Sequence, residues 1–374
     1  MIASSIRLGK IAGIEIGVNY SLLLIAALVT YQLYAFELPQ RAPGFSESSY
    51  LVYGVFGALL FFASILWHEL AHSLMARFYK IRVRRIVLFF LGGVAEIEQE
   101  PRKAHQEFWI AILGPISSVV LGGLFLGAGS LIGGATVMAE VFFWLGLINI
   151  LLAIFNMIPG FPLDGGRVLR AAIWWISGSY LRATRWASYI GQGFAYFLIL
   201  SGIVSLFVNT LLIGSALWLL ILGVFLLNAA KGHLQSAHVR VGLSGISLGE
   251  LVRNRMPVDA SWPLPYAIDM MAVGSGGVAS AAPVVRNGQL VGVLALETLQ
   301  VLPRLQWGGT RVENVMVPID RVRAVEAQRD LYEALQDEDL RQQPYLLITD
   351  DRRPIGFLSQ RDIMNFAERR LRST

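Results

Sequence analysis

Residues 51–75 of the chain read LVYGVFGALLFFASILWHELAHSLM, a long apolar run that ends in the motif HELAH. A run of this length can cross a bilayer as a single helix. On such a helix His68 and His72 share one face, and Glu69 lies beside them. Ionisable side chains are costly inside a membrane and are kept there mainly for function. A lone histidine would indicate an interhelical hydrogen bond, but this trio predicts a zinc site with an adjacent base.

The composition of the whole chain is that of a membrane protein. The 374 residues are 55% hydrophobic and 15% charged, which is too apolar for an ordinary soluble enzyme. Long uncharged stretches occur before Lys231, and the sequence after Val239 is mixed and charged. We therefore expect a membrane domain over residues 1–235 and a soluble domain over 236–374. The chain has no cysteine, which leaves histidine and carboxylate as ligands for a metal.

Six apolar segments are long enough, or nearly so, to span a bilayer, which takes about 20 residues. They cover residues 18–36, 51–75, 108–132, 137–158, 186–208 and 211–230. If these spans alternate, almost all the arginines and lysines near their ends fall on one side. The positive-inside rule then predicts a multi-pass protein of the cell membrane, with both termini and the soluble domain in the cytoplasm. This pattern also explains the net charge of +5 without nucleic acid as a partner.

A short β-hairpin is expected between the second and third spans. Residues 82–84 and 94–98 alternate in polarity on either side of Gly92-Gly93. Because an open sheet edge is not tolerated in hydrocarbon, the hairpin must lie at the cytoplasmic interface or inside the protein. Its edge could accept an added strand from a substrate peptide, or the hairpin could be only a packed connection.

The fourth span ends in an unusual segment, NMIPGFPLDGGR, at residues 156–167. Its prolines and glycines end the helix and let the backbone approach a neighbour. Asp164 is the only carboxylate in the segment. A helix rises about 1.5 Å per residue, so depth in the membrane can be estimated along each span. By this estimate, the end of the fourth span lies at the same depth as the two histidines in the second span. We therefore expect Asp164 to be a third metal ligand, the alternative being a simple Asp-Gly-Gly turn outside the membrane.

The soluble domain contains an internal repeat, with copies at about residues 244–304 and 311–371. Arg255-Met256 recurs as Val315-Met316, and each copy continues with a β-α-β-type pattern. The pair resembles a tandem CBS module, a regulatory unit that binds adenine nucleotides. In that family a Ser or Thr and an Asp hold the ribose, which implies Ser359 and Asp362 as a site for ATP, ADP or AMP in the second copy. The first copy has Ala295 and Thr298 instead. The alternative is a structural pair, or one that forms a homodimer, without a ligand.

The two membrane motifs together carry a more specific resemblance. HELAH, followed by Asn156-x-x-Pro159-x-x-Pro162-Leu163-Asp164-Gly165, resembles the site-2 protease family of intramembrane zinc metalloproteases. The likeness covers most of the first 230 residues, and the C-terminal pair is similar to the branch of the family that carries CBS domains. Asn19 stands where that branch often has His, and Ser118 replaces an Asn. Neither position is expected to touch the ligand set.

This resemblance implies a function for the named residues. His68, His72 and Asp164 would bind one Zn²⁺, and Glu69 would act as the general base. Asn156 would bind the oxyanion or the substrate backbone, with Pro159 and Pro162 in the same substrate-binding segment; an interhelical hydrogen bond is the alternative for Asn156. The substrate would be the transmembrane helix of another membrane protein, with nucleotide at the CBS pair regulating access.

Two other classes of function remain open from the sequence. CBS pairs also follow membrane bundles in channels, so a CBS-regulated ion transporter is one alternative. A catalytically inactive membrane scaffold is the other. His105, His233 and His238 lie in polar or junction segments and are expected at the surface.

Overall fold

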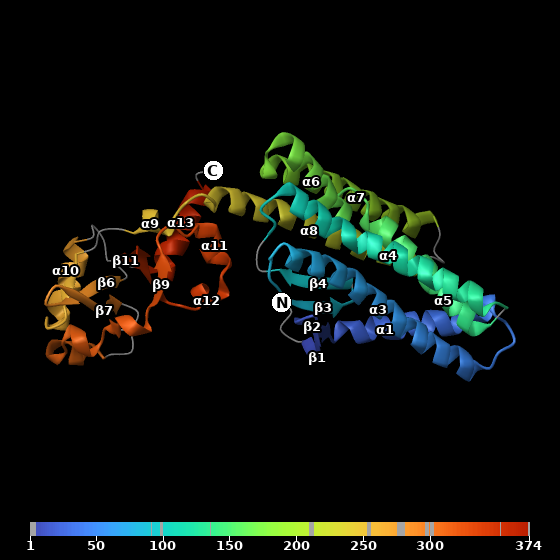
Figure 1. The fold of residues 1–374 in the computed structure, drawn as a ribbon, viewed down its shortest axis with the longest axis horizontal. Helices are drawn as coiled ribbons and strands as arrows, with labels where there is room; N and C mark the ends of the chain where they lie inside the picture. The colour runs from blue at the N-terminus through green and yellow to red at the C-terminus, as the bar shows by residue number, and fades with distance from the viewer. Residues whose placement is uncertain are drawn as a thin grey trace. The chain divides into compact units, whose positions relative to one another are not determined.

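The computed structural model describes residues 5–90, 92–97, 100–134, 136–208, 213–252, 256–274, 281–295, 299, 303–351 and 353–372. The chain divides into two compact units, Met1–Ala237 and His238–Thr374. The first is a helical bundle with a small sheet, and the second contains two further sheets with short helices (Figure 1).

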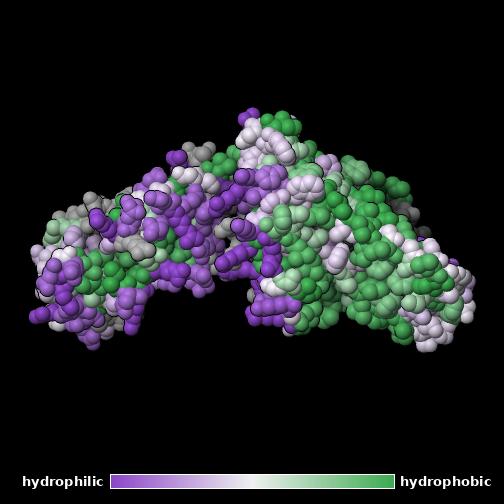
Figure 2. Space-filling view, in the orientation of Figure 1, coloured by the Kyte–Doolittle hydropathy of each residue, from purple (hydrophilic) through white to green (hydrophobic). Residues whose placement is uncertain are grey.

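Six helical stretches of the described residues are long and apolar enough to cross a membrane, which confirms the predicted multi-pass fold. The first, Ser21–Arg41, consists of α1 (Ser21–Gln32), a π-helical turn (Leu33–Glu37) and α2 (Leu38–Arg41). The others are α3 (Glu47–Phe78), α4 (Ala104–Ile132), α5 (Val137–Asn156), α7 (Tyr180–Val208) and α8 (Ile213–Leu243). A broad apolar surface covers this unit (Figure 2). Several helices extend beyond the predicted apolar segments into polar sequence, as α3 does at both ends.

A four-stranded sheet lies beside α3 (Figure 1). It contains β1 (Ser5–Ile11), β2 (Ile14–Asn19), β3 (Val83–Phe89) and β4 (Gly92–Ile97), in that order. The β3–β4 hairpin was predicted, but the sequence interpretation missed β1 and β2, and β2 pairs in parallel with β3. It also placed Gly92-Gly93 in the turn, whereas both are paired residues of β4. Part of the expected hairpin, Leu91 and Glu98, lies outside the described residues.

The inner face of this sheet and one face of α3 share an apolar core. Ile14, Ile16, Ile86 and Leu88 from the strands pack with Leu70 of α3 in a single buried cluster. The cluster also includes Ile110 of α4. Removal of these side chains from water or lipid into a packed interior fixes the rotation of α3. The HELAH turn is therefore held between the sheet and α4.

The segment after α5 turns back and starts a helix, α6 (Asp164–Ser177), that the sequence interpretation did not predict. Asp164 is its first residue rather than part of an open loop. The turn is tight: a Cβ on Gly165 would lie 2.4 Å from the backbone carbon of Met157, and one on Gly166 would lie 2.4 Å from that of Gly160. Glycine is needed at these positions because the backbone of the loop contacts the first turn of α6.

The second unit consists of two related halves, as expected for a tandem CBS pair. The first half has α9 (Leu248–Leu251), β5 (Val258–Asp259), α10 (Leu264–Gly274), β6 (Ala281–Arg286) and β7 (Gln289–Ala295). The second has β8 (Val317–Pro318), β9 (Arg323–Glu326), α11 (Leu331–Gln336), α12 (Glu338–Arg341), β10 (Tyr345–Asp350), β11 (Arg353–Ser359) and α13 (Gln360–Arg372). The sheets have the orders β5-β6-β7-β8 and β11-β10-β9. Two residues used in the repeat argument, Arg255 and Thr298, lie outside the described residues.

Candidate metal centre

His68 and His72 lie on one face of α3 and point toward each other. Both side chains are buried, each with 4% of its surface exposed. Their ring centroids are 4.8 Å apart, and their Nε2 atoms are 3.2 Å apart. The i and i+4 spacing of the HELAH motif produces this geometry because a helix has about 3.6 residues per turn.

Asp164 completes a compact group of donor atoms. Its Oδ2 lies 3.1 Å from Nε2 of His68 and 3.1 Å from Nε2 of His72. All three residues are buried, and their potential ligand atoms lie within 4.8 Å of one another. In a tetrahedral zinc site with ligand distances of about 2.0–2.1 Å, neighbouring donors are separated by about 3.3 Å. The donor set and its spacing therefore fit one zinc ion.

The remaining ring nitrogens of the histidines are held by α4. Nδ1 of His72 lies 2.6 Å from the carbonyl oxygen of Ile110, and Nδ1 of His68 lies 2.9 Å from Oγ of Ser118. A carbonyl only accepts, so Nδ1 of His72 donates and its Nε2 presents a lone pair to the centre. The sequence interpretation was wrong to place Ser118 away from the ligand set, because it is a direct partner of His68.

Gly114 of α4 leaves room at the centre. A Cβ built on it would lie 2.2 Å from Nε2 of His72 and 2.8 Å from Nε2 of His68. Only a residue without a side chain allows α4 to approach both donor nitrogens this closely. The sequence interpretation did not include Gly114 in the site, because the rotation of α4 relative to α3 cannot be obtained from spacing.

Glu69 lies beneath the β3–β4 hairpin. A Cβ on Gly93 of β4 would lie 2.5 Å from Cγ and 3.1 Å from Cδ of Glu69. Gly93 therefore brings the sheet backbone directly against the carboxyl group. At the outer end of this hairpin, Arg85 donates two hydrogen bonds of 2.8 Å to Glu96 and holds the pKa of that carboxyl below its usual value.

The other predicted membrane residues lie between the end of α5 and the start of α6. Asn156 ends α5 and is half-buried, Pro159 is exposed, and Pro162 is half-buried after a cis peptide bond with Phe161. Within the described part of the chain, Asn156 forms no side-chain hydrogen bond with the trio. Asn19, the other departure noted in the sequence, accepts a hydrogen bond of 3.0 Å from the amide of Ser21.

A second buried polar group lies between α4 and α6. Nε of Arg170 donates to Oε1 of Glu107 at 2.6 Å, and its Nη2 donates to the same oxygen. Its Nη1 donates to the Tyr180 hydroxyl at 2.7 Å. Burial alone would lower the pKa of Arg170, but the Glu107 carboxylate raises it above its usual value, so the guanidinium remains charged. The sequence interpretation missed this ion pair because it joins helices that are distant in sequence.

Of the three histidines expected at the surface, two are half-buried. His233 is half-buried and stacks on Phe161, with ring centroids 4.4 Å apart and planes at 15°. His105 is half-buried against the ring of Tyr79, and His238 is exposed. Aromatic stacking within the bundle was not visible from the junction position of His233.

In the second unit, Ser359 and Asp362 form a reciprocal cap at the start of α13. The Ser359 hydroxyl donates to Oδ2 of Asp362 at 2.7 Å, and the amide of Asp362 donates back to the hydroxyl at 3.1 Å. Ser359 is buried, with 1% of its surface exposed. The structure thus brings together the two residues implied as the ribose site. The structure also gives them a local structural role, since such a cap provides hydrogen-bond partners for the backbone amides at the start of a helix.

A bundle of membrane-length helices around a buried His-His-Asp trio with an adjacent glutamate is typical of an intramembrane metalloprotease. The comparisons with known proteins agree. Residues 56–139 and 134–200 match Peptidase family M50. The chain is 35% identical, over 92% of its length and 90% of the other, to a protein of Synechocystis sp. named as a zinc metalloprotease. The chain therefore belongs to the M50, or site-2 protease, family of zinc metalloproteases.

Further relatives include a protein of Mycobacterium tuberculosis named as the zinc metalloprotease Rip3, which is 30% identical over 96% of this chain and 92% of the other. Among solved structures, the site-2 protease from Methanocaldococcus jannaschii is 29% identical, with 62% of this chain and 95% of that chain covered and a TM-score of 0.43. The CBS domain of a bacterial CNNM/CorC family Mg²⁺ transporter, solved with ATP, is 16% identical, with 35% and 93% covered and a TM-score of 0.29.

Proposed function

We propose that His68, His72 and Asp164 bind one catalytic zinc ion, with which the chain cleaves transmembrane segments of other membrane proteins. The observation that carries this proposal is the convergence of three buried donors, from α3 and from the start of α6, within 4.8 Å. Their protein environment supports it. Ile110 and Ser118 orient the imidazoles, and Gly114 leaves space beside their Nε2 atoms.

A zinc ion at the trio would polarise the scissile carbonyl and make a water molecule acidic enough to be deprotonated near neutral pH. Glu69 takes that proton and returns it to the nitrogen of the leaving amine. Contact between Gly93 and the Glu69 side chain positions the carboxyl group for both transfers. Asn156, at the end of α5, would donate a hydrogen bond to the oxyanion or to the substrate backbone, with Pro159 and Pro162 shaping the adjacent wall.

A substrate helix must unwind locally before it can react. Its peptide groups are engaged in their own hydrogen bonds, so the scissile carbonyl is not presented to a metal. Strand β4 offers a place for the unwound segment, because it pairs only with β3 among the described strands and its Gly93 contacts Glu69. Addition of an extended peptide to this edge would satisfy the exposed amides of both partners.

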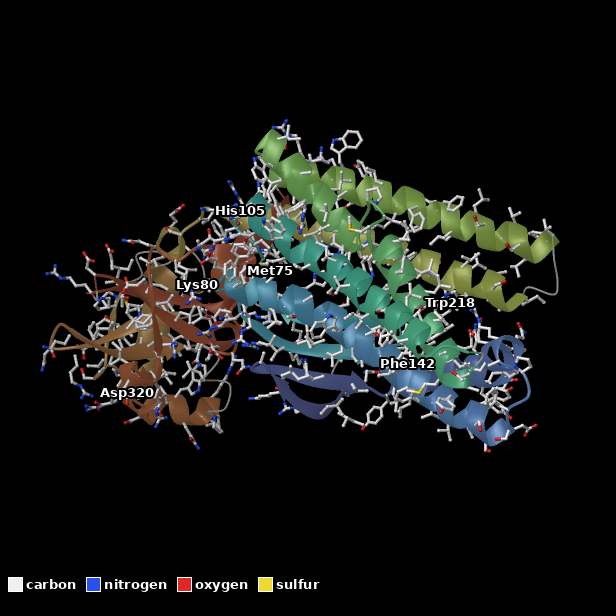
Figure 3. The ribbon with its side chains drawn as sticks, turned by 45° about the vertical axis from the view of Figure 1, so that its right-hand side comes forward. Met75, Lys80, His105, Phe142, Trp218 and Asp320 are labelled. Atoms are coloured by element: carbon white, nitrogen blue, oxygen red, sulfur yellow. The ribbon has the colours of Figure 1, made fainter. Side chains whose placement is uncertain are left out.

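The same proposal places both termini and the second unit in the cytoplasm. Lys80 and His105 lie at one end of the bundle, and Phe142 and Trp218 lie toward the other (Figure 3). The arginines and lysines that follow α3 lie near the first of these ends in sequence, as the positive-inside rule requires of the cytoplasmic side. A membrane-held transcription regulator is one substrate class compatible with cleavage from this side.

The test combines proteolysis with metal analysis in detergent-purified protein. We expect Glu69→Gln to abolish cleavage of a reporter transmembrane helix while the zinc content stays at that of the wild type. Asp164→Ala should lower the zinc content. Glu47→Gln, at the exposed start of the same helix, is the matched control and should keep both. Removal of zinc with a chelator should stop cleavage, and added zinc should restore it.

Retained proteolysis in Glu69→Gln would refute the assignment of the base. Metal flux through liposomes that survives Glu69→Gln would instead support the transporter alternative. Absence of zinc from the wild-type protein would overturn the ligand set itself.

The proposal extends to regulation by adenine nucleotide at Ser359 and Asp362. Their proximity supports it, although a ribose would have to share oxygens that already cap α13. Regulation requires that nucleotide binds the open and closed states with different affinity. Calorimetry with ATP, ADP and AMP tests it, with Asp330→Asn, a cap residue of α11, as the control. Light scattering with and without nucleotide tests whether the CBS pair also forms a homodimer.

A further inference from the structure

The buried pair between Arg170 and Glu107 has no part in the proton transfers described above. Arg170 has 5% of its surface exposed and Glu107 has none. Burial of an ion pair carries a large desolvation cost, and an apolar pair of similar size often gives equal or better stability. A charged pair at this position therefore requires a reason other than stability.

Glu107 lies on the same face of α4 as the residues that contact the two histidines. Glu107, Ile110, Gly114 and Ser118 follow each other at intervals of three or four residues, so they form one stripe along α4. The carbonyl of Ile110 and the hydroxyl of Ser118 are the hydrogen-bond partners of the two histidines, and Gly114 faces their Nε2 atoms. The same stripe of α4 thus contacts both α3 ligands and, through Glu107, the arginine of α6.

Arg170 lies in the helix that begins with the third donor and contacts the segments around it. Arg170 belongs to α6, which begins at Asp164. Its guanidinium carbon lies 4.8 Å from the ring centroid of Phe161, in the loop before Asp164, and 4.8 Å from that of Tyr180 in α7. The backbone amide of Phe161 also donates to the carbonyl of Ala187 in α7 at 3.1 Å. Arg170 therefore contacts the segments on both sides of the third donor.

We propose that Arg170, held by Glu107, is a positioning residue that fixes the Asp164 carboxylate relative to the two imidazoles. The contacts run from α3 through the stripe on α4 to α6. One helix, α4, therefore fixes the positions of all three donors. A planar guanidinium is suited to this role because it donates in fixed directions and stacks on aromatic rings. This inference rests on the proposed zinc site and extends it.

Small displacements matter at such a centre. The donor atoms are separated by 3.1–3.2 Å, and functional constellations tolerate shifts of only about 0.5 Å. Loss of the guanidinium fork frees α6 and the loop at Phe161 to move relative to α4. The bundle remains packed, but the third donor no longer meets the other two at a fixed distance.

The experiment measures the zinc dissociation constant of the full-length protein in detergent, by competition with a chromophoric chelator, and the absorption spectrum of the Co²⁺-substituted site. Arg170→Lys keeps the charge and loses the fork, and Glu107→Gln keeps a hydrogen-bond acceptor and loses the charge. We expect each to raise the zinc dissociation constant about 10- to 100-fold, as is typical for partners of metal ligands, and to alter the Co²⁺ spectrum. The control is Arg41→Lys, in the exposed pair with Glu37, which should change neither.

The double variant separates positioning from general destabilisation. If the two residues act as one unit, Arg170→Lys combined with Glu107→Gln should weaken zinc binding no more than the stronger single change. If Arg170→Lys does not fold, Tyr180→Phe decides, because it removes the acceptor of Nη1 and should raise the dissociation constant a few-fold. Unchanged zinc affinity and an unchanged Co²⁺ spectrum, with only a lower unfolding temperature, would overturn the inference.

Failure of this inference is distinguishable from failure of the proposed function. If the wild type binds zinc and Asp164→Ala does not, the ligand set stands whatever the Arg170 variants do. If Asp164→Ala binds zinc as tightly as the wild type, the proposed site itself is wrong.

Discussion

Gly114 of α4 and His72 of α3 approach so closely that a Cβ on the glycine would lie 2.2 Å from the Nε2 atom of the histidine. The approach is possible because α4 carries no side chain where it crosses the HELAH turn. A methyl group at this position would overlap the donor nitrogen and the volume in which a ligated metal would lie. The two helices thus share a contact that is specific to the centre.

We predict that Gly114→Ala lowers zinc affinity by at least about 100-fold, since it displaces a ligand directly rather than through a partner. Gly127→Ala on the same helix is the control, because a Cβ there meets no atom within 4 Å. Chelator competition gives the affinities, and circular dichroism verifies the helices. Equal zinc affinity in both variants would contradict the placement of α4.

Ser118→Ala should weaken zinc binding about tenfold, because Nδ1 of His68 loses its partner and the ring orientation is no longer fixed. Ser118 is fully buried and 2.9 Å from that nitrogen. Ser117→Ala is the matched control, because its hydroxyl bonds the carbonyl of Gly114 at 2.7 Å and not a histidine. The prediction fails if the two serine variants lose zinc at the same chelator concentration.

Gly93→Ala should reduce kcat about 10- to 100-fold with zinc still bound, because the new methyl group displaces the Glu69 carboxyl from its position for proton transfer. A Cβ at Gly93 would lie 2.5 Å from Cγ of Glu69. Val94→Ala in the same strand is the control, since Val94 is 37% exposed. Cleavage rates at saturating reporter, measured alongside metal content, test the prediction. A normal kcat in Gly93→Ala would show that the glutamate adapts without loss.

Acid should weaken the β3–β4 pairing through Glu96. Arg85 holds the pKa of Glu96 below its usual value, so the ionised form is favoured in the folded sheet. The pair therefore contributes fully above the ordinary glutamate pKa of about 4.3, and its contribution is lost as the pH falls through the lower folded value. The side chains are partly exposed, so the effect stays below about 1 kcal/mol. The protection of β4 amides against hydrogen exchange, measured relative to the intrinsic exchange rate at each pH, should fall in acid for the wild type, and Arg85→Gln should remove most of that pH dependence.

The membrane helices and the two histidines could be predicted from the sequence because both depend on local patterns. A membrane-length apolar run forms a helix almost regardless of its neighbours, and the spacing of His68 and His72 places them on one face. Asp164 could be named because it is the only carboxylate in a segment that ends at the right depth. The first two inferences need only one element at a time, and the third needs only the depths of two spans.

The remaining features depend on how elements meet. Strands β1 and β2 are short, and their place in the sheet depends on the parallel pairing of Ile16 with Ile86, far along the chain. The contacts of Ser118 and Gly114 depend on the rotation of α4 relative to α3. Helix α6 was missed because its arginines were interpreted as the polar flank of a span, whereas Arg170 is buried against Glu107.

The separation of His68 and Asp164 by 96 positions affects the biogenesis of the protein. A ribosome that has translated α3 and α4 has produced two imidazoles and a glutamate in the membrane, but not the acid that would complete the proposed centre. With the proposed ligand set, hydrolytic capacity would arise only after α6 has emerged and docked. The nascent chain would then be unable to cut its own newly inserted segments, or those of its neighbours, during the earlier part of its synthesis.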